Sequence, residues 1–219
     1  MKNLFLFLFL LVVFTSKAQD NRVSGLNSRQ FTKYWKVESE SPDYKVTFQG
    51  DTAEIVSPKG LTLWRKEKMS GKVTIEYDAC VVVESDGDRL SDLNCFWMAS
   101  DPQYPDNLWK REKWRSGIFL NCYSLQLYYL GYGGNHNSTT RFRRYDGDES
   151  GITNPKARPA ILKEYTDAGH LLKPNHWYHI KITNENNRVS YYIDGKRLVD
   201  FRDAEPLTEG WFGFRTTLS

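Results

Sequence analysis

The chain has 219 residues, of which 30 are Lys or Arg and 27 are Asp or Glu, giving a formal net charge of +3. Acidic and basic residues are interleaved, so no basic patch predicts a nucleic-acid or membrane partner. Aromatic residues make up 15% of the chain, with 7 Trp and 13 Tyr. This surplus suits either a carbohydrate-binding face or the core of a large β-sandwich, and composition does not choose between them.

The N-terminus has the features of a secretory signal peptide. Lys2 is followed by the apolar run Leu4–Phe14 and then by small polar residues up to Ala18. The run is too short for a permanent membrane anchor, so we expect cleavage near Ala18. The sequence therefore predicts a leader at residues 1–18, a single domain at residues 19–219, and a secreted or periplasmic protein.

Short segments of alternating apolar and polar residues recur along the rest of the chain, which is typical of an antiparallel sandwich or barrel. The Asp194-Gly195 pair strongly indicates a hairpin, and Asn186-Asn187 indicates a second one. A helical period appears only over Pro159–Thr166. The predicted strands, in chain order, are Tyr44–Phe48, Glu54–Val56, Thr62–Arg65, Val73–Val83, Asn94–Ala99, Gly117–Leu120, Ser124–Gly131, Thr140–Tyr145, Trp177–Asn184, Arg188–Ile193, Lys196–Asp203 and Gly210–Thr216.

The last fifty residues resemble the C-terminal hairpins of concanavalin A-like jelly rolls. The resemblance lies in the segment HWYHIKITNENNRVSYYIDGKRLVDF and in GWFGFRT after it. There a Trp opens one strand, an Asp-Gly turn ends the next, and a glycine-flanked aromatic strand closes the sheet. We expect an all-β fold, a concanavalin A-like jelly-roll sandwich of two antiparallel sheets. That sandwich hosts lectins, hydrolases, lyases and binding modules, so it predicts no single function.

The three cysteines, Cys80, Cys95 and Cys122, each lie in an apolar run. An odd count permits at most one disulfide, and the spacing matches no zinc pattern. We expect all three to be structural.

Polar and aromatic side chains concentrate in the segment YSLQLYYLGYGGNHNSTTRFRRYDG. Successive side chains of a strand point to opposite faces, so the apolar set Leu125, Leu127 and Tyr129 is expected to face the core. Gln126 and Tyr128 are then expected to project from the concave outer face, where jelly rolls bind glycans.

Two more strands extend this pattern. In TTRFRRY, Arg141, Arg143 and Tyr145 share the face opposite Phe142, and His179 projects from the strand WYHIKI. We expect these strands to bring a polar cluster to one surface, the alternative being the ordinary solvated face of a half-buried sheet. The cluster comprises Gln126, Tyr128, Arg141, Arg143 and His179.

Two loops carry further candidates. His136 lies in the Gly-rich turn GYGGNHNST, where it either transfers protons near neutral pH or is an inert exposed side chain. Trp97 and Trp109 lie near prolines in NCFWMASDPQYPDNLW, which favours a loop at the rim of a groove where sugar rings stack. The alternative for Trp97 is the core.

The acidic residues give weaker signals. Glu76 and Asp78 match part of the E-x-D-x-E strand of retaining hydrolases, but Cys80 stands where the third carboxylate would be. We expect these carboxylates to be paired on the polar face of a strand, with a glycoside hydrolase as an alternative.

No metal is predicted, because His176 and His179 lack a third ligand at a suitable spacing. An aspartate-rich turn is expected at ESDGDRLSD, with a structural calcium ion as the alternative, held by Asp86, Asp88 and Asp92.

Over about Lys33–Thr217 the chain resembles the DUF6250 family of small secreted bacterial jelly-roll proteins. The resemblance rests on the segments FWMASDP, SLQLYYLGYGG, TTRFRRYDG, LLKPNHWYHI, YYIDG and EGWFGFRTT. Its members tend to accompany polysaccharide-degrading enzymes. The family is similar to jelly-roll polysaccharide lyases and to an oligosaccharide dehydratase from ulvan breakdown. The resemblance implies β-elimination from a uronic-acid-containing oligosaccharide, with no cofactor.

This chemistry needs a group that neutralises the carboxylate, a base for the C5 proton and an acid for the oxygen that leaves C4. Guanidinium groups match a carboxylate in bidentate fashion, so Arg141 and Arg143 are the expected clamps. Gln126, Asn121 and Arg115 are expected to complete the substrate site. His136 or His179 is the expected base, and Tyr128 or Tyr145 the expected acid. The Gln-Ile-His common in jelly-roll lyases reads Gln126-Leu127-Tyr128 here, which leaves the base open.

We favour a dehydratase that removes water from a terminal uronate to give a 4,5-unsaturated uronyl residue. The alternatives are an endo-acting polysaccharide lyase with the same chemistry and a non-catalytic carbohydrate-binding module. The sequence does not identify the glycan or the oligomeric state.

Overall fold

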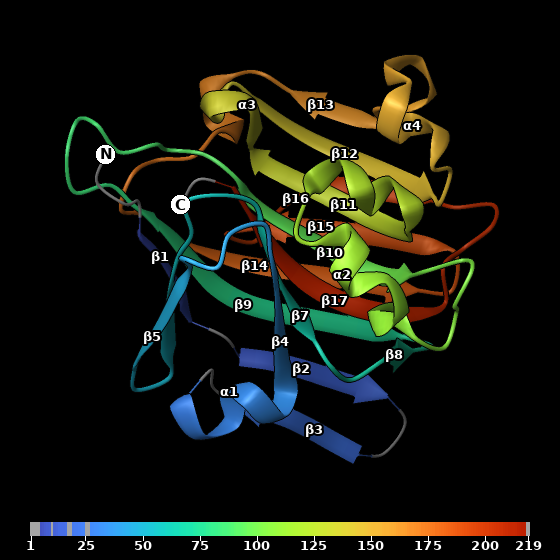
Figure 1. Cartoon of the computed structure of the whole chain (residues 1–219), viewed down its shortest axis with the longest axis horizontal. Coiled ribbons are helices and arrows are strands. Elements are labelled where there is room, and N and C mark those ends of the chain that lie inside the picture. The colour runs from blue at the N-terminus through green and yellow to red at the C-terminus, as the bar shows by residue number, and fades with distance from the viewer. Residues whose placement is uncertain (1–4, 10, 17–18, 25–26, 218–219) are drawn as a thin grey trace.

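The computed structural model describes residues 5–9, 11–16, 19–24 and 27–217. Two antiparallel sheets that pack face to face make up most of it (Figure 1). The strands of the described residues are β1 (Phe5–Phe9), β2 (Leu11–Ser16), β3 (Gln19–Ser24), β4 (Trp35–Ser39), β5 (Lys45–Gln49), β6 (Thr52–Val56), β7 (Leu61–Arg65), β8 (Met69–Ser70), β9 (Val73–Val82), β10 (Leu93–Ser100), β11 (Gln126–Gly133), β12 (Thr139–Asp146), β13 (Lys163–Tyr165), β14 (Trp177–Glu185), β15 (Arg188–Ile193), β16 (Lys196–Arg202) and β17 (Glu209–Thr216).

The helical segments are short and lie outside the sheets. The longest, α1 (Ser28–Tyr34), begins after Asn27, whose side chain accepts a hydrogen bond from the Gln30 amide at 3.1 Å. The others lie in connections between strands: η1 (Leu108–Arg111), α2 (Glu112–Arg115), η2 (Phe119–Ser124), α3 (Gly134–Asn137), α4 (Ser150–Thr153), η3 (Pro155–Ala157) and η4 (Ala168–His170).

The larger sheet has the order β13-β12-β11-β10-β17-β7-β4, and the smaller one has the order β16-β15-β14-β9-β1-β6-β5. Strand β8 pairs with the start of β17, and β2 pairs with β3. Every predicted strand except Gly117–Leu120 coincides with a strand of the structure, which confirms the all-β sandwich. The predicted hairpin at Asp194-Gly195 is also confirmed, and both residues have the positive φ, 50° and 76°, of a type I′ turn.

Two sequence predictions of secondary structure are wrong. Gly117–Leu120 is not a strand, because Ser116 and Gly117 both adopt positive φ and the chain then enters η2. Pro159–Thr166 is not a helix, because Lys163–Tyr165 forms β13 against the open edge of β12. In both places contacts made by the folded chain override the local preference of the sequence.

The predicted leader, residues 1–18, is only partly described by the structure and stays a prediction. Phe5–Phe9 forms β1 and pairs with both β9 and β6 in the smaller sheet. The expected cleavage near Ala18 falls outside the described residues and stays a prediction. Over the described residues, the search for a helix long and apolar enough to span a membrane found none.

The space between the sheets holds the main core. Its aromatic residues include Tyr77, Trp97, Tyr128, Phe142 and Tyr191, all with 2% or less of their surface exposed. The three cysteines are free and buried, as expected for structural residues. Burial raises the pKa of Cys95 to about 12 and that of Cys122 to about 11, so both thiols stay protonated at neutral pH.

A buried ion pair holds the connection between β10 and β11 against the larger sheet. We call this connection, residues 101–125, the cover segment. Arg115 in α2 donates to Glu38 on β4 at 2.9 Å and to the Leu108 carbonyl at 2.7 Å, and both charged side chains are buried. Gly117 then approaches the backbone of β4 so closely that a Cβ atom would lie 2.6 Å from the Glu40 nitrogen. The cover segment is therefore fixed by charge and by close backbone contact.

Replacing Arg115 tests this attachment. Arg115→Met leaves the Glu38 carboxylate buried without its partner, and we expect the free energy of unfolding to fall by about 3–5 kcal/mol. Urea unfolding measures the change. The control Lys181→Met removes an exposed ion pair to Glu76, and we expect it to cost less than about 1 kcal/mol. Equal losses in the two variants would contradict the role of the buried pair.

Candidate functional site

The outer face of the larger sheet carries a second apolar cluster beneath the cover segment and α4 (Figure 1). The cover segment contributes Leu108, Cys122 and Tyr123. Both faces of this sheet are therefore buried over part of their area. The sheet residues of the cluster are Trp64, Phe96, Ala99, Leu127, Tyr129, Tyr145 and Trp211.

This second cluster reverses the expected orientation of β11. Leu127 and Tyr129 face outward under the cover segment, whereas Tyr128 faces the space between the sheets. The Tyr128 hydroxyl donates to Asp203 at 2.6 Å and accepts from the Leu207 amide at 3.1 Å. Its ring packs against that of Trp97, with centroids 5.6 Å apart. The predictions that Tyr128 and Trp97 contact substrate are wrong, because both side chains are fully buried in the core.

A row of polar side chains crosses the outer face of the larger sheet at one level. Cross-strand pairing places these residues opposite one another in order from β13 to β4, and we call them the polar row. Directly opposed residues of antiparallel strands have Cβ atoms about 5 Å apart, so the row forms a continuous polar band. Its members are Glu164, Arg141, Gly131, Asn94, Arg215, Thr62 and Glu38.

The hydroxyl of Tyr129 lies over the glycine of the polar row. A Cβ atom on Gly131 would lie 2.3 Å from this hydroxyl oxygen, so only glycine leaves room for it. Gly131 pairs with Asn94 on one side and with Arg141 on the other. The Tyr129 hydroxyl is therefore directed into the row, and we find no hydrogen bond from it to another described residue.

Several charged groups surround this hydroxyl. The Asp92 carboxylate accepts from the Arg89 guanidinium at 2.7 Å and from the side-chain amide of Asn94 at 3.2 Å. Burial raises the pKa of Tyr129, Asp92 raises it further, and Arg215 and Arg143 oppose the rise. Tyr129 is therefore protonated at neutral pH and can donate a hydrogen bond to a ligand.

Three buried polar atoms beside the row have no hydrogen-bond partner within the described chain. They are the Asn94 side-chain oxygen and the Nε atoms of Arg215 and Arg89. Arg215 donates from Nη1 to the Gly117 carbonyl and, at 3.3 Å, to the Thr62 hydroxyl, and from Nη2 to the Thr217 hydroxyl at 3.4 Å. Buried polar groups without partners are rare in folded proteins, and an ordered water or ligand atom commonly satisfies them.

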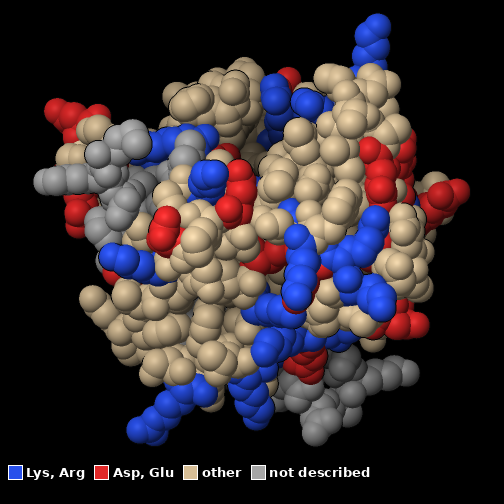
Figure 2. All heavy atoms as spheres, in the orientation of Figure 1, with Lys and Arg blue, Asp and Glu red and all other residues tan. Residues whose placement is uncertain are grey.

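The surface above this part of the sheet is hollowed. Figure 2 shows a recess between the regions of α3 and α4, with Lys or Arg atoms and an acidic group at its edge. Arg141 keeps 34% of its side chain exposed and pairs with Glu164 at 2.6 Å, while Arg89 keeps 21% exposed. A ligand can therefore reach Arg141 and Arg89 from solvent, whereas Arg215 and Asn94 are buried beneath them.

The expected orientation of β12 is confirmed. Arg143 and Tyr145 pair with Tyr129 and Leu127 on the outer face, and Phe142 lies in the core between the sheets. Arg143 donates to the Pro159 carbonyl. Tyr145 is fully buried between other aromatic rings, so Tyr129 presents its hydroxyl to the polar row in place of Tyr145.

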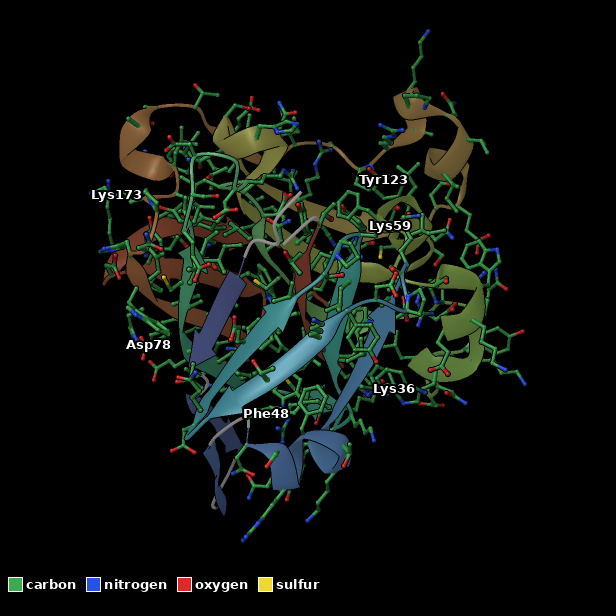
Figure 3. All side chains as sticks on the ribbon, turned by 60° about the vertical axis from the view of Figure 1, so that its left-hand side comes forward. Lys36, Phe48, Lys59, Asp78, Tyr123 and Lys173 are labelled. Atoms are coloured by element: carbon green, nitrogen blue, oxygen red, sulfur yellow. The ribbon has the colours of Figure 1, made fainter. Side chains whose placement is uncertain are left out.

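The expectation that His179 shares a surface with Arg141 and Arg143 is wrong, because His179 lies on β14 of the other sheet. Its Nδ1 is 2.8 Å from Asp78 on β9, and both side chains face outward from the smaller sheet. In Figure 3 Asp78 lies on the opposite side of the sandwich from Tyr123, which belongs to the cover segment. Because it lies on the outer face of the other sheet, His179 is not part of the candidate site.

Two other predicted substrate contacts, Arg115 and Asn121, have structural partners instead, and a third, Gln126, lies on the other face of the sheet. Arg115 is fully buried and bonded to Glu38, so it cannot clamp a substrate as predicted. Asn121 donates to the Trp114 carbonyl at 3.0 Å at the end of α2. Gln126 is half-buried at the start of β11 and shares the face of Tyr128 rather than that of the polar row.

His136 lies on the turn between β11 and β12, at one end of the outer face. It is exposed and has a positive φ of 56°, as do Asn135 and Asn137 with 53° and 54°. Three consecutive non-glycine residues in this conformation are unusual. Residues with such uncommon backbone angles are found more often at functional sites. The catalytic role of His136 stays a prediction.

The acidic candidates are engaged elsewhere. Glu76 pairs with Lys181 at 2.6 Å and Asp78 pairs with His179, which is the satisfied strand face that the sequence indicates. In the aspartate-rich loop, Asp88 accepts from the amides of Glu84 and Ser85 and closes a turn. Among the described residues, no group of three or more His, Cys, Asp or Glu is placed to hold a metal ion.

Sequence reasoning missed Asn94, Arg215 and Arg89, considered Asp92 only as a possible calcium ligand, and assigned Tyr129 to the core. Asn94 and Arg215 are 121 positions apart but directly paired on β10 and β17. Their only local signal was a polar residue inside an apolar strand, in LNCFWM and in GFRTT. The order of strands in the sheet was needed to bring them together.

The architecture is that of a jelly-roll sandwich with a partly covered polar face. The chain belongs to the family described as a domain of unknown function (DUF6250), whose family model matches residues 55–219. A search of curated proteins found no match.

Solved structures of low sequence identity share the fold. A Bacillus subtilis protein of unknown function with a galectin-like fold is 17% identical, with a TM-score of 0.66, over 88% of this chain and 86% of that chain. The carbohydrate-binding module CBM66 from Bacillus subtilis is 16% identical, with a TM-score of 0.52, over 84% and 88%. A glycoside hydrolase family 16 endo-glucanase from Bacteroides ovatus is 14% identical, with a TM-score of 0.52, over 86% and 83%.

Filling the space at Gly131 tests the position of Tyr129. The added methyl group of Gly131→Ala collides with the Tyr129 hydroxyl, so we expect the free energy of unfolding to fall by about 1–3 kcal/mol. Urea unfolding measures the change. The control Gly87→Ala adds the same group in a loop where the nearest atom is 4.0 Å away, and we expect it to cost less. Equal losses in the two variants would show that the Tyr129 hydroxyl does not lie over Gly131.

Proposed function

We propose that this protein binds a uronic-acid-containing oligosaccharide at the polar row and eliminates the substituent at C4. The observation that carries the proposal is that buried polar atoms of Asn94, Arg215 and Arg89 without a partner among the described residues lie on the same face as the Tyr129 hydroxyl over Gly131. The fold shared with a carbohydrate-binding module and an endo-glucanase supports a saccharide as the ligand. Several arginines on one face favour an acidic one.

The reaction begins with removal of the C5 proton by a base. The electron pair left at C5 forms the C4–C5 double bond, and the bond from C4 to its oxygen breaks. That oxygen takes a proton from an acid and leaves as water in a dehydratase, or as the hydroxyl group of the next sugar in a lyase. Both routes give a 4,5-unsaturated uronyl residue, and we favour the dehydratase that acts on ulvan-type oligosaccharides.

Cationic side chains neutralise the substrate carboxylate and so make the C5 proton more acidic. Arg141 and Arg143 come from β12, and Arg215 with Asn94 lies across the row from them. Fixed donors aimed at developing negative charge commonly contribute about 3–4 kcal/mol each to lowering the barrier. The arginines are already held by the Pro159 and Gly117 carbonyls and by Glu164, so little reorganisation accompanies binding.

Tyr129 supplies the proton to the leaving oxygen. We expect Tyr129→Phe to lower kcat by about 10²–10⁴-fold with little change in KM, because it removes only the hydroxyl. The raised pKa of Tyr129 keeps it protonated, so the wild-type rate should not fall through loss of its proton up to about pH 10. The control Tyr104→Phe makes the same change at an exposed tyrosine of the cover segment. Equal rates in wild type and Tyr129→Phe would exclude this acid.

His136 is the base that we retain, since His179 lies on the other sheet. We expect His136→Ala to lower kcat by about 10²–10⁴-fold and His179→Ala to leave it unchanged. Both histidines are exposed, so neither change should affect folding strongly. Similar rates for the two variants would remove His136 from the mechanism.

Incubation with ulvan, alginate, pectin and glucuronan oligosaccharides tests the reaction. The product absorbs in the ultraviolet through its conjugated double bond, and mass spectrometry separates the two routes. Loss of one water without chain shortening identifies a dehydratase, and shorter chains identify a lyase. Saccharide binding without any new double bond would overturn the elimination.

A non-catalytic binding module is the second candidate. Trp114 on the cover segment keeps 44% of its surface exposed, with the Arg111 guanidinium 5.0 Å from its ring centroid. An exposed ring beside a cation suits stacking on an acidic sugar. Calorimetric binding that needs Trp114 but is unaffected by Tyr129→Phe would favour this candidate.

A further inference from the structure

A second pocket lies at one end of the sandwich. Its volume is about 270 Å³, and it opens between the loop that precedes β14 and the hairpin that joins β15 to β16. Lys173, which lines it, lies far from Tyr123 of the cover segment in Figure 3. None of the polar-row residues lines this pocket, so it is distinct from the candidate site.

The orientation of His170 in this pocket is fixed by three contacts. Its Nδ1 lies 2.8 Å from the Asp167 carboxylate, and its Nε2 lies 3.2 Å from Nζ of Lys196. A lysine ammonium group can only donate, so Nε2 accepts and Nδ1 carries the proton toward Asp167. The Tyr165 ring stacks on the imidazole at 4.1 Å. Lys196 is therefore held at the pocket by a neutral partner.

Two lysines and one carboxylate line the pocket. Lys173 and Lys196 form no ion pair with an acid in the part of the chain that the structure describes, and Lys196 instead contacts the His170 imidazole at 3.2 Å. Asp194, the acidic residue in the lining, accepts from the His179 backbone amide at 2.8 Å and lies 3.3 Å from His176. An anionic group can therefore contact the Lys196 ammonium group without displacing a carboxylate from it.

The rest of the lining suits a sugar ring. Ile193 and Leu198 give an apolar surface, and Tyr132 and Tyr178 also line the pocket, with their hydroxyls bonded to the Leu171 carbonyl and the Lys173 amide. Sites that enclose drug-sized ligands have volumes of about 300–1,000 Å³, so this pocket fits a single small unit. We propose that it binds one acidic sugar unit, with the carboxylate or sulfate group on Lys196 and Lys173.

Two hydrogen bonds connect this pocket to the turn that carries His136. The Asn137 side chain donates to the Leu172 carbonyl at 2.9 Å and accepts from the Leu172 amide at 2.8 Å. Leu172 also packs against Gly133, where a Cβ atom would lie 2.3 Å from the leucine side chain. The pocket is therefore placed to hold another unit of the chain bound at the polar row. This assignment rests on the proposed function for the class of sugar.

The four histidines of the chain allow a direct test. His170 and His176 lie at the pocket, His136 lies on the turn beside the polar row, and His179 lies on the other sheet. Nuclear magnetic resonance of the imidazole rings, during titration with glucuronate, sodium sulfate or glucose, reports on each place separately. We expect glucuronate to shift the signals of His170 and His176, glucose to shift neither, and His179 to stay constant.

Variants separate this pocket from the candidate active site. We expect Lys196→Met to weaken glucuronate binding at His170 at least about tenfold, because one ammonium group of the pair is lost. The control Lys181→Met and the variant Tyr129→Phe should leave that binding unchanged. A sulfate response at the same signals assigns the pocket to oxyanions in general, and glucuronate alone assigns it to carboxylated sugars.

Three results would overturn the proposal: no shift at His170 and His176 with either anion, equal shifts with glucose, or unchanged binding in Lys196→Met. The test needs no turnover. Failure of elimination with intact binding at the pocket would therefore count against the proposed function alone, and intact elimination without pocket binding against this inference alone.

Discussion

The structure depends on the way in which the outer face of the larger sheet is closed. An antiparallel sheet commonly packs one face on the core and leaves the other in water. Here the cover segment buries Trp64, Phe96 and Tyr129 on the second face, and a buried Arg115–Glu38 pair fixes it in place. The polar row lies beside this covered area, so its charged groups sit partly out of water, where electrostatic interactions are stronger. The same cover segment thus both buries the outer face of the larger sheet and borders the polar row.

Much of the fold could be predicted from the sequence, because most strands alternate and are separated by recognisable turns. The Asp194-Gly195 hairpin is an example, since its backbone conformation requires those residue types. The errors fell where distant contacts decide the structure. Lys163–Tyr165 is extended because β12 offers an open edge, and residues 117–120 curl because Gly117 must approach β4. No local pattern carries that information.

The candidate site was predicted only in part, and alternation explains why. In β12 the sequence separates Phe142 from Arg141 and Arg143, and the structure agrees. In β11 both sets of alternating residues are apolar enough to be buried, so the choice between Tyr128 and Tyr129 was arbitrary without the cover segment. The pairing of Asn94 with Arg215 joins two strands that are far apart in the sequence. A correct periodicity can therefore place a residue on the wrong side of a sheet when both sides are covered.

The burial of the three thiols lowers their chemical reactivity once the chain has folded. Burial raises the pKa of the Cys95 thiol to about 12, so it stays protonated at neutral pH, and only the thiolate attacks disulfides or oxidants at a useful rate. Once folded, Cys95 and Cys122 are therefore chemically silent, and Cys80 is also buried with a raised pKa. A protein with an odd number of cysteines would otherwise be prone to form mixed disulfides in an oxidising compartment. Here the completed core protects the chain from covalent dimers without any disulfide of its own.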